Sequence, residues 1–316
     1  MPFMKAQYLV TGGGGFIGSN IVRCLLSNGQ GVRVLDDFST GRRENLVGIE
    51  NDIELVEGDI RDNPTLKKAL KGIQYVLHLA AIPSVVRSVE DPLMTNSVNV
   101  CGTLKILIES RDAGIERVVF SSSSSVYGDT PTLPKQEDMN PMPRSPYALS
   151  KLTGEYYCRM FRELYGLKAF SLRYFNVFGP RQNPNSQYAA VIPRFIDALK
   201  NNQSPLIHGD GNQTRDFTFV EDVAAANLCC CTAPEASAGS ACNIGCGDRI
   251  TINELAIKIA AIMGKDIKAA HDAPQKGDVR DSQADISRAK TLIGWTPTVN
   301  LDTGLRKTVE WFLQNG

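Results

Sequence analysis

The chain has 316 residues, of which 42% are hydrophobic and 22% charged, so it is long enough to bury one large core or two smaller ones. Lys and Arg number 34 and so do Asp and Glu, which leaves no overall field to favour nucleic acid or an anionic membrane surface. No run of about eighteen apolar residues occurs and no signal-type segment begins the chain, so we expect a cytoplasmic protein without membrane insertion.

The cysteines do not follow a metal-binding pattern. Eight cysteines and three histidines occur, and no two cysteines have the Cys-x-x-Cys spacing. We therefore expect reduced, mostly buried thiols and no metal site.

The first predicted strand, over residues 7–10, leads into a glycine-rich turn and then a helix. Glycines at 12, 15 and 18 permit a tight turn, close approach of a pyrophosphate to backbone N–H groups, and close packing of the helix on the strand. This pattern predicts a dinucleotide site. Its candidate ligands at the turn are Gly12, Gly15, Phe16, Ile17 and Gly18.

The second predicted strand, over residues 31–35, ends in Asp36, eighteen residues after Gly18. A carboxylate at this point hydrogen-bonds free ribose hydroxyls and repels a 2′-phosphate, so Asp36 favours NAD over NADP. The nearby Arg42 and Arg43 leave the NADP alternative open.

Further strands are expected at 53–57, 75–79 and 117–121, alternating with helices near 64–71 and 97–113. This alternation predicts an α/β protein with a Rossmann-type doubly wound parallel sheet. Cofactor contacts are expected at strand ends, from Asp59, Ile60 and Ala80. Asn99 is a further candidate beside the cofactor, either as a polar residue that bridges to the active-site backbone or as a buried amide that is satisfied internally. His78 is expected to be a packed strand residue.

Two motifs carry candidate catalytic chemistry. Ser145 and Pro146 begin a helix on which Tyr147 and Lys151 lie one turn apart. Lowering the pKa of a phenol from about 10 to about 7 takes roughly 4 kcal/mol, and we expect the Lys151 ammonium and the helix N-terminus to supply it. The serine run 121–125 ends a strand facing the same crevice, so a hydroxyl there can relay a proton.

Together these features resemble the extended short-chain dehydrogenase/reductase family. The segments LRYFNVFGP at 172–180, GDG at 209–211 and TRDF at 214–217 resemble its UDP-hexose 4-epimerase branch. The resemblance implies a Rossmann domain over 1–176 and about 217–243, and a smaller, discontinuous α/β substrate domain over 177–216 and about 244–316. It also implies bound NAD, a UDP-sugar substrate and a homodimer formed through helices near 97–113 and 147–165.

The same resemblance implies a mechanism. Tyr147 takes the proton of the 4-hydroxyl while C4 loses its hydride, Lys151 lowers the Tyr147 pKa, and Ser123 hydrogen-bonds the 4-oxygen. The 4-keto sugar then turns over and is reduced on its other face. Related 4,6-dehydratases carry an Asp-Glu pair where this chain has Ser124 and Ser125, so dehydration is disfavoured.

Several residues are implied to bind the substrate. Asn176 and Arg215 resemble phosphate and sugar ligands, and Ala190 with Val191 resembles the uracil-facing segment. Ser282 stands where glucose-specific relatives have Tyr, which leaves room for a 2-acetamido group. The full implied set is Ser84, Ser123, Ser124, Asn176, Gln182, Ala190, Val191, Arg215, Arg280 and Ser282.

Some alternatives remain open at this point. Many relatives have Arg at the position of Gln275, and either Lys276 or Arg280 replaces that charge or phosphate binding is weaker. Arg87 keeps a UDP-uronate epimerase or decarboxylase open as the alternative enzyme. A non-catalytic NAD-sensing regulator is the remote alternative.

Overall fold

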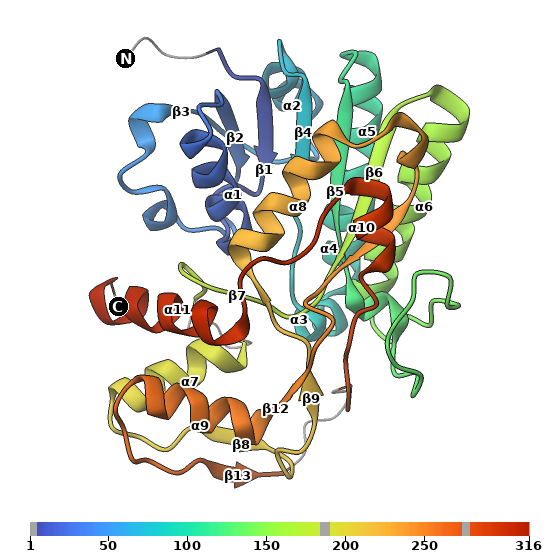
Figure 1. Ribbon diagram of the computed structural model, residues 1–316. Helices are drawn as coiled ribbons and strands as arrows, with labels where there is room; N and C mark the ends of the chain where they lie inside the picture. Colours follow the sequence, from blue (N-terminus) through green and yellow to red (C-terminus); the bar gives the residue numbers. More distant parts are fainter. Residues whose placement is uncertain (1–4, 184–189, 274–278, 316) are drawn as a thin grey trace.

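The computed structural model describes residues 5–183, 190–273 and 279–315, and one parallel sheet dominates it (Figure 1). Neighbouring strands in this sheet follow the order β11-β6-β5-β4-β1-β2-β3. Their bounds are β1 Tyr8–Thr11, β2 Val32–Asp36, β3 Ile53–Glu57, β4 Tyr75–His78, β5 Arg117–Ser123, β6 Lys168–Tyr174 and β11 Ala241–Ile244. The order reverses direction between β1 and β4, so the predicted doubly wound sheet is confirmed and its ligand crevice lies outside the carboxyl ends of these strands.

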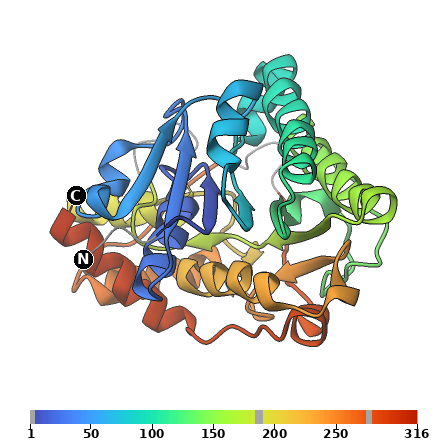
Figure 2. The same ribbon diagram turned by 90° about the horizontal axis from the view of Figure 1, so that it is seen from above.

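Helices cover both faces of the sheet, as the view from above shows (Figure 2). One face carries α1 (Phe16–Ser27), α8 (Val220–Thr232) and α10 (Ser287–Ile293). The other carries α2 (Asn63–Leu70), α5 (Thr103–Asp112) and α6 (Pro146–Tyr165). Short helices α3 (Val85–Glu90) and α4 (Pro92–Thr95) and a π-helical segment, Asn96–Gly102, lead into α5. Each face thus buries its own apolar cluster, as strands covered on both sides require.

Helix α6 begins where the sequence predicts. The Ser145 hydroxyl accepts a hydrogen bond from the Ala148 N–H at 3.1 Å, and Pro146 occupies the first turn. Gly166, at φ 72°, ends the helix in the left-handed conformation. These signals place Tyr147 in the first turn, at the carboxyl edge of the sheet.

A second lobe lies below that edge in Figure 1 and has its own apolar cluster. Its helices are α7 (Val191–Lys200), α9 (Ile252–Ile262) and α11 (Leu301–Asn315). Three two-stranded sheets complete it: β7 (Val177–Phe178) with β10 (Thr218–Phe219), β9 (Thr214–Arg215) with β12 (Ile250–Thr251), and β8 (Leu206–His208) with β13 (Ala270–Asp272). The chain therefore enters this lobe more than once, as a discontinuous domain requires.

One predicted domain boundary is wrong. Helix α10 was expected in the second lobe, but Ala289, Ile293 and Trp295 are buried in the cluster shared by α1 and α8. Trp295 also donates its indole N–H to the Asp222 carbonyl of α8 at 3.0 Å. The apolar side chains of α10 pack on the Rossmann side, so the chain returns to the sheet before α11.

No helix within the described ranges is both long enough and apolar enough to cross a membrane.

Candidate functional site

A cavity of about 730 Å³ runs along the carboxyl ends of the strands and reaches the second lobe. It gathers most of the residues that the sequence predicts. Those that line it are Gly12, Gly15, Phe16, Ile17, Gly18, Asp36, Asp59, Ile60, Ala80, Ser123, Ser124, Tyr147, Lys151, Asn176, Gln182, Ala190, Arg215 and Ser282.

The glycine turn leaves the space that a dinucleotide needs. Gly12 has φ 72°, and a Cβ there would lie 2.7 Å from the Ala80 nitrogen of the neighbouring strand end. A Cβ on Gly18 would overlap the Gly12 carbonyl. Helix α1 begins at Phe16 without a side-chain cap, so its first N–H groups are available to an anion at the cavity. The turn therefore fits a pyrophosphate.

Asp36 is buried at the end of β2 beside this turn. Its carboxylate accepts N–H bonds from Gly14 at 2.7 Å and Phe38 at 2.8 Å. Burial raises its pKa while the two N–H bonds lower it. The two arginines that could bind a 2′-phosphate form ion pairs with other residues, Arg42 with Glu44 and Arg43 with Glu57. This arrangement favours free ribose hydroxyls over a 2′-phosphate.

The candidate catalytic groups lie together on α6 and β5. The Lys151 ammonium is 4% exposed, donates to the Ser121 carbonyl at 2.7 Å and lies 5.8 Å from the centre of the Tyr147 ring. Burial lowers the Lys151 pKa to about 8. Burial raises the Tyr147 pKa, and the hydrogen bond with Ser123 lowers it.

In the protein without a bound cofactor, burial of the Tyr147 phenol raises its pKa and outweighs the hydrogen bond with Ser123. The Lys151 ammonium is the buried cation beside the Tyr147 ring.

Ser123 is oriented by its neighbour. Its hydroxyl oxygen accepts hydrogen bonds from the Ser125 hydroxyl at 2.9 Å and the Ser125 N–H at 3.2 Å. Ser123 can therefore keep its own proton for a donor bond into the cavity.

Asn99 does not line the cavity, so a direct cofactor contact is not supported. Its amide accepts from the Ile82 N–H at 2.8 Å and donates to the Ser150 hydroxyl at 3.1 Å on α6. Asn99 therefore bridges the backbone of Ile82, which lines the cavity, to helix α6. His78 is also buried, between Thr11 and Thr103. Burial and, to a smaller extent, the positive charge of Lys151 lower its pKa to about 3. His78 is therefore a neutral packed residue, as predicted.

Asn176 and Ser282 line the cavity near the second lobe. The Asn176 amide, in a residue with φ 29°, donates to the Asp216 carbonyl at 2.8 Å and to the Ser282 hydroxyl at 3.1 Å. The fully buried Asp216 carboxylate accepts N–H bonds from Cys246, Gly247 and Ala284 at 2.7–3.0 Å. Asp216 thus joins three chain segments behind these two side chains.

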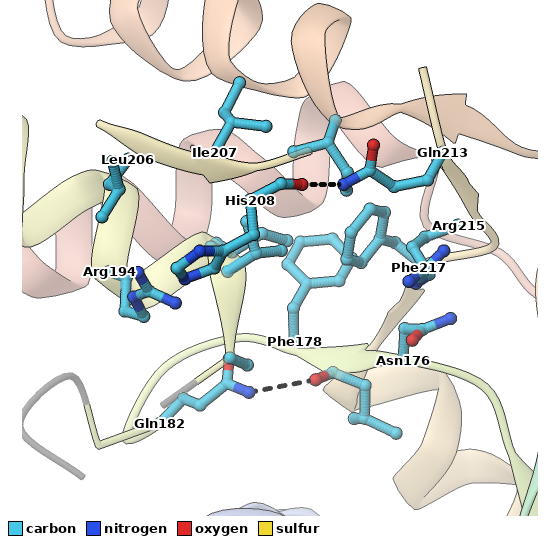
Figure 3. A pocket seen from close by; sticks show the side chains of 15 residues that line it. Asn176, Phe178, Gln182, Arg194, Leu206, Ile207, His208, Gln213, Arg215 and Phe217 are labelled. Atoms are coloured by element: carbon cyan, nitrogen blue, oxygen red, sulfur yellow. Dashed lines mark hydrogen bonds between the residues drawn. The ribbon is translucent and has the colours of Figure 1, made fainter. Parts of the chain in front are cut away.

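A second cavity of about 250 Å³ continues into the lobe (Figure 3). Phe178 and Phe217 meet edge to face near its centre, with ring centroids 6.1 Å apart. Val191 lies here with Ala190, Gln182 and Arg215. The Gln182 amide donates to the Val177 carbonyl at 3.2 Å, while its oxygen is buried without a partner in the part of the chain that the structure describes.

Two predicted substrate ligands lie outside both cavities. The Ser84 hydroxyl accepts the Arg87 N–H at 3.1 Å and so caps the N-terminus of α3, where backbone N–H groups have no acceptor within the helix. Arg280 is exposed and its guanidinium lies 3.7 Å from the Asp210 carboxylate. Neither placement supports direct substrate binding. Gln275 and Lys276 lie outside the described residues.

Lys135 lines the large cavity and was missed in the sequence. It stands in a polar loop without a motif, and its place depends on a backbone bridge to Ala284 far along the chain. No local signal reveals such a contact.

Comparison with known proteins adds a family model and close relatives. Residues 8–245 match the model described as the NAD dependent epimerase/dehydratase family. The chain is 43% identical over 308 residues to a UDP-glucose 4-epimerase of Mycolicibacterium smegmatis, covering 96% of this chain and 97% of that one. It is 42% identical over 309 residues to a putative UDP-glucose 4-epimerase of Methanocaldococcus jannaschii, covering 97% and 98%.

A solved structure resembles this chain in both sequence and fold. The UDP-N-acetylglucosamine 4-epimerase from Methanobrevibacter ruminantium M1, in complex with UDP-N-acetylmuramic acid, has a TM-score of 0.94 and 42% identity, covering 99% of this chain and 100% of that one.

Proposed function

The chain belongs to the NAD-dependent epimerase/dehydratase family, and from that premise we propose that it inverts C4 of a UDP-hexose through a transient 4-keto sugar. UDP-N-acetylglucosamine and its C4 epimer are the first substrate pair, and UDP-glucose with UDP-galactose is the second. The observation that carries the proposal is one cavity in which Tyr147, Lys151 and Ser123 meet both the glycine turn and the sugar side, Asn176 and Ser282.

NAD is the cofactor of this family; bound at this site it would supply a reversible hydride acceptor and, in its oxidised form, a positive charge. The residues that would hold it are the turn glycines, Asp36 and Lys151. Since hydride is returned to the same sugar, the reaction has no net redox change.

The chain's own groups handle the proton. Tyr147 accepts the proton of the sugar 4-hydroxyl, and the Ser123 hydroxyl donates a hydrogen bond to the 4-oxygen and keeps its own proton, because Ser125 occupies its acceptor side. Lys151 stabilises the phenolate. After the keto sugar has turned, the same groups return the proton on the opposite face.

The substrate must be held at its nucleotide end while the hexose turns. The smaller cavity, with Phe178, Val191 and Arg215, suits a uracil and its diphosphate. The small side chains Ser124 and Ser282 border the larger cavity and leave room for a 2-acetamido group. Neither Ser124 nor Ser125 is a carboxylic acid, which argues against dehydration.

One observation keeps a UDP-uronate epimerase or decarboxylase as the second candidate. Arg87, the basic residue that the sequence offers for this alternative, is exposed on α3 and outside the cavity. The buried Lys135 is inside it instead, so the sugar region is not free of positive charge.

The test follows the anomeric protons by NMR in UDP-N-acetylglucosamine and in UDP-glucose, with and without added NAD. Tyr147→Phe should lower kcat by about 10²–10⁴-fold because it removes the proton acceptor, with UDP-sugar binding kept. Tyr165→Phe, the same change at an exposed tyrosine on the same helix, is the control. Turnover of neither hexose, with turnover of UDP-glucuronate, would replace this proposal by the uronate one.

A further inference from the structure

Lys135 occupies an unusual place for an ammonium group. It is 2% exposed and lines the large cavity together with Ser124, Ser125 and Ser282. Its backbone is fixed there, because its N–H donates to the Gln283 carbonyl at 2.7 Å and its carbonyl accepts from the Asp285 N–H at 2.9 Å. Lys135 is thus held beside the segment that carries Ser282.

Among the described residues, the Lys135 ammonium hydrogen-bonds only to neutral acceptors. It donates to the carbonyl and, at 2.6 Å, to the hydroxyl of Thr130. Within the described ranges no carboxylate lies within 4.0 Å of it: Glu137, the acidic residue nearest in sequence, pairs with Arg288 at 3.8 Å, and Asp129, whose charge acts on Lys135 from farther away, pairs with Arg144 at 3.1 Å. An ammonium has three N–H donors, so one remains after both bonds to Thr130. Burying a cation without a counter-charge in contact is costly, and such a group at a cavity marks a ligand that supplies the acceptor.

The other cations at the cavity have different tasks. Lys151 donates to the Ser121 carbonyl beside Tyr147, and Arg215 stands at the nucleotide end, where its guanidinium donates to the Thr214 and Arg280 carbonyls. The carboxylate of Asp281, also at the cavity, accepts from Thr214. Among the described cations that line the large cavity, Lys135 therefore has no role in proton transfer or in diphosphate binding.

We propose that Lys135 selects the substrate by donating a hydrogen bond to a carbonyl or carboxylate oxygen on a hexose substituent, which is either the 2-acetamido group or a C6 carboxylate. The inference rests on the proposed function, since it places a UDP-hexose in this cavity. Plain glucose offers only hydroxyl groups, so it gains least from a fixed cation.

The experiment measures dissociation constants by calorimetry for UDP, UDP-glucose, UDP-N-acetylglucosamine and UDP-glucuronate on the NAD-loaded protein. Lys135→Met keeps the length of the side chain and removes the charge. We expect it to weaken binding of the acetamido sugar or of the uronate by about tenfold or more, the usual effect of losing a hydrogen bond to a charged group, and to change UDP and UDP-glucose by less than about twofold. The sugar whose affinity falls identifies the substituent that Lys135 contacts. Lys135→Arg should restore part of the lost affinity.

Lys105→Met is the matched control, because Lys105 is partly buried and also donates to a backbone carbonyl, that of Arg61, away from the cavity. An equal loss for UDP and all three sugars would show a structural role, and unchanged affinity for every ligand would remove Lys135 from recognition; either result overturns the inference. Binding does not require turnover. Failure of the wild-type protein to epimerise any hexose would therefore count against the proposed function alone.

Discussion

The buried charge of Lys151, which the proposed reaction uses, lowers the stability of the fold. Its ammonium is buried with one carbonyl acceptor, and burial lowers its pKa from 10.5 to about 8. Below pH 8 the folded and unfolded chains are both protonated, so the folded chain bears the full cost of the buried charge. Between pH 8 and 10.5 only the unfolded chain keeps the proton, so this contribution to stability rises with pH.

We therefore expect Lys151→Met to abolish epimerisation and to stabilise the fold. The shift corresponds to an increase of up to about 3 kcal/mol in the free energy of unfolding at pH 7, shrinking toward pH 10. Urea unfolding of both proteins at pH 7 and pH 9.5 measures the difference. A variant that is less stable at both pH values would show that the contacts of the lysine outweigh its desolvation.

Single residues also show what sequence can and cannot predict. Gly12, Gly18 and Asp36 could be placed because turn chemistry and the strand end are local. Arg280 was misplaced because a charge in a sequence does not reveal which neighbour pairs it. Lys135 was missed because the loop that holds it is fixed by residues about 150 positions later, through the bridge to Ala284.

Helix α6 presents an apolar stripe on its exposed face. Leu149, Tyr156, Met160 and Leu164 are all exposed, at spacings of seven, four and four residues that align them on one side of the helix. A monomer gains nothing from such a stripe. A second copy of this chain would cover it, which agrees with the homodimer implied by the family resemblance.

The expected consequence is that Tyr156→Glu combined with Met160→Glu gives a monomer at micromolar concentration, since two buried carboxylates oppose a helix contact. Sedimentation velocity measures the mass. Leu313→Glu, equally exposed but on α11, should leave the dimer intact. A wild-type chain that sediments as a monomer would refute this assignment of the stripe.

The whole molecule joins two lobes that both line the large cavity. The glycine turn and Tyr147 of helix α6 are on the side of the large sheet, whereas Arg215 and Phe217 belong to the second lobe. Asp222 of α8 ties the two together, because its carboxylate accepts the N–H groups of Thr298 and Val299 just before α11. The alternation of strands and helices predicted the sheet; the return of α10 to it was not predictable, because α10 is short and its few apolar residues are compatible with either core.

We expect one cooperative thermal transition that either ligand shifts. At about 100 times its dissociation constant, a ligand adds roughly 2.7 kcal/mol to the free energy of unfolding, a few degrees in Tm for a chain of this length. Calorimetry with NAD, with UDP and with both should show shifts that add. Two separate transitions, each moved by one ligand, would show that the lobes unfold independently.

The late arrival of α8 and β11 has a consequence for synthesis on the ribosome. The strands β1 to β6 are complete once Tyr174 has emerged, yet the face of the sheet beside α1 is covered only by residues from Val220 onward. Until then the nascent chain displays an apolar surface and an open edge at β6, where β11 later pairs. A chain stalled before Val220 is accordingly a substrate for chaperones, and the exposure ends only when α8, β11 and α10 have all covered this face.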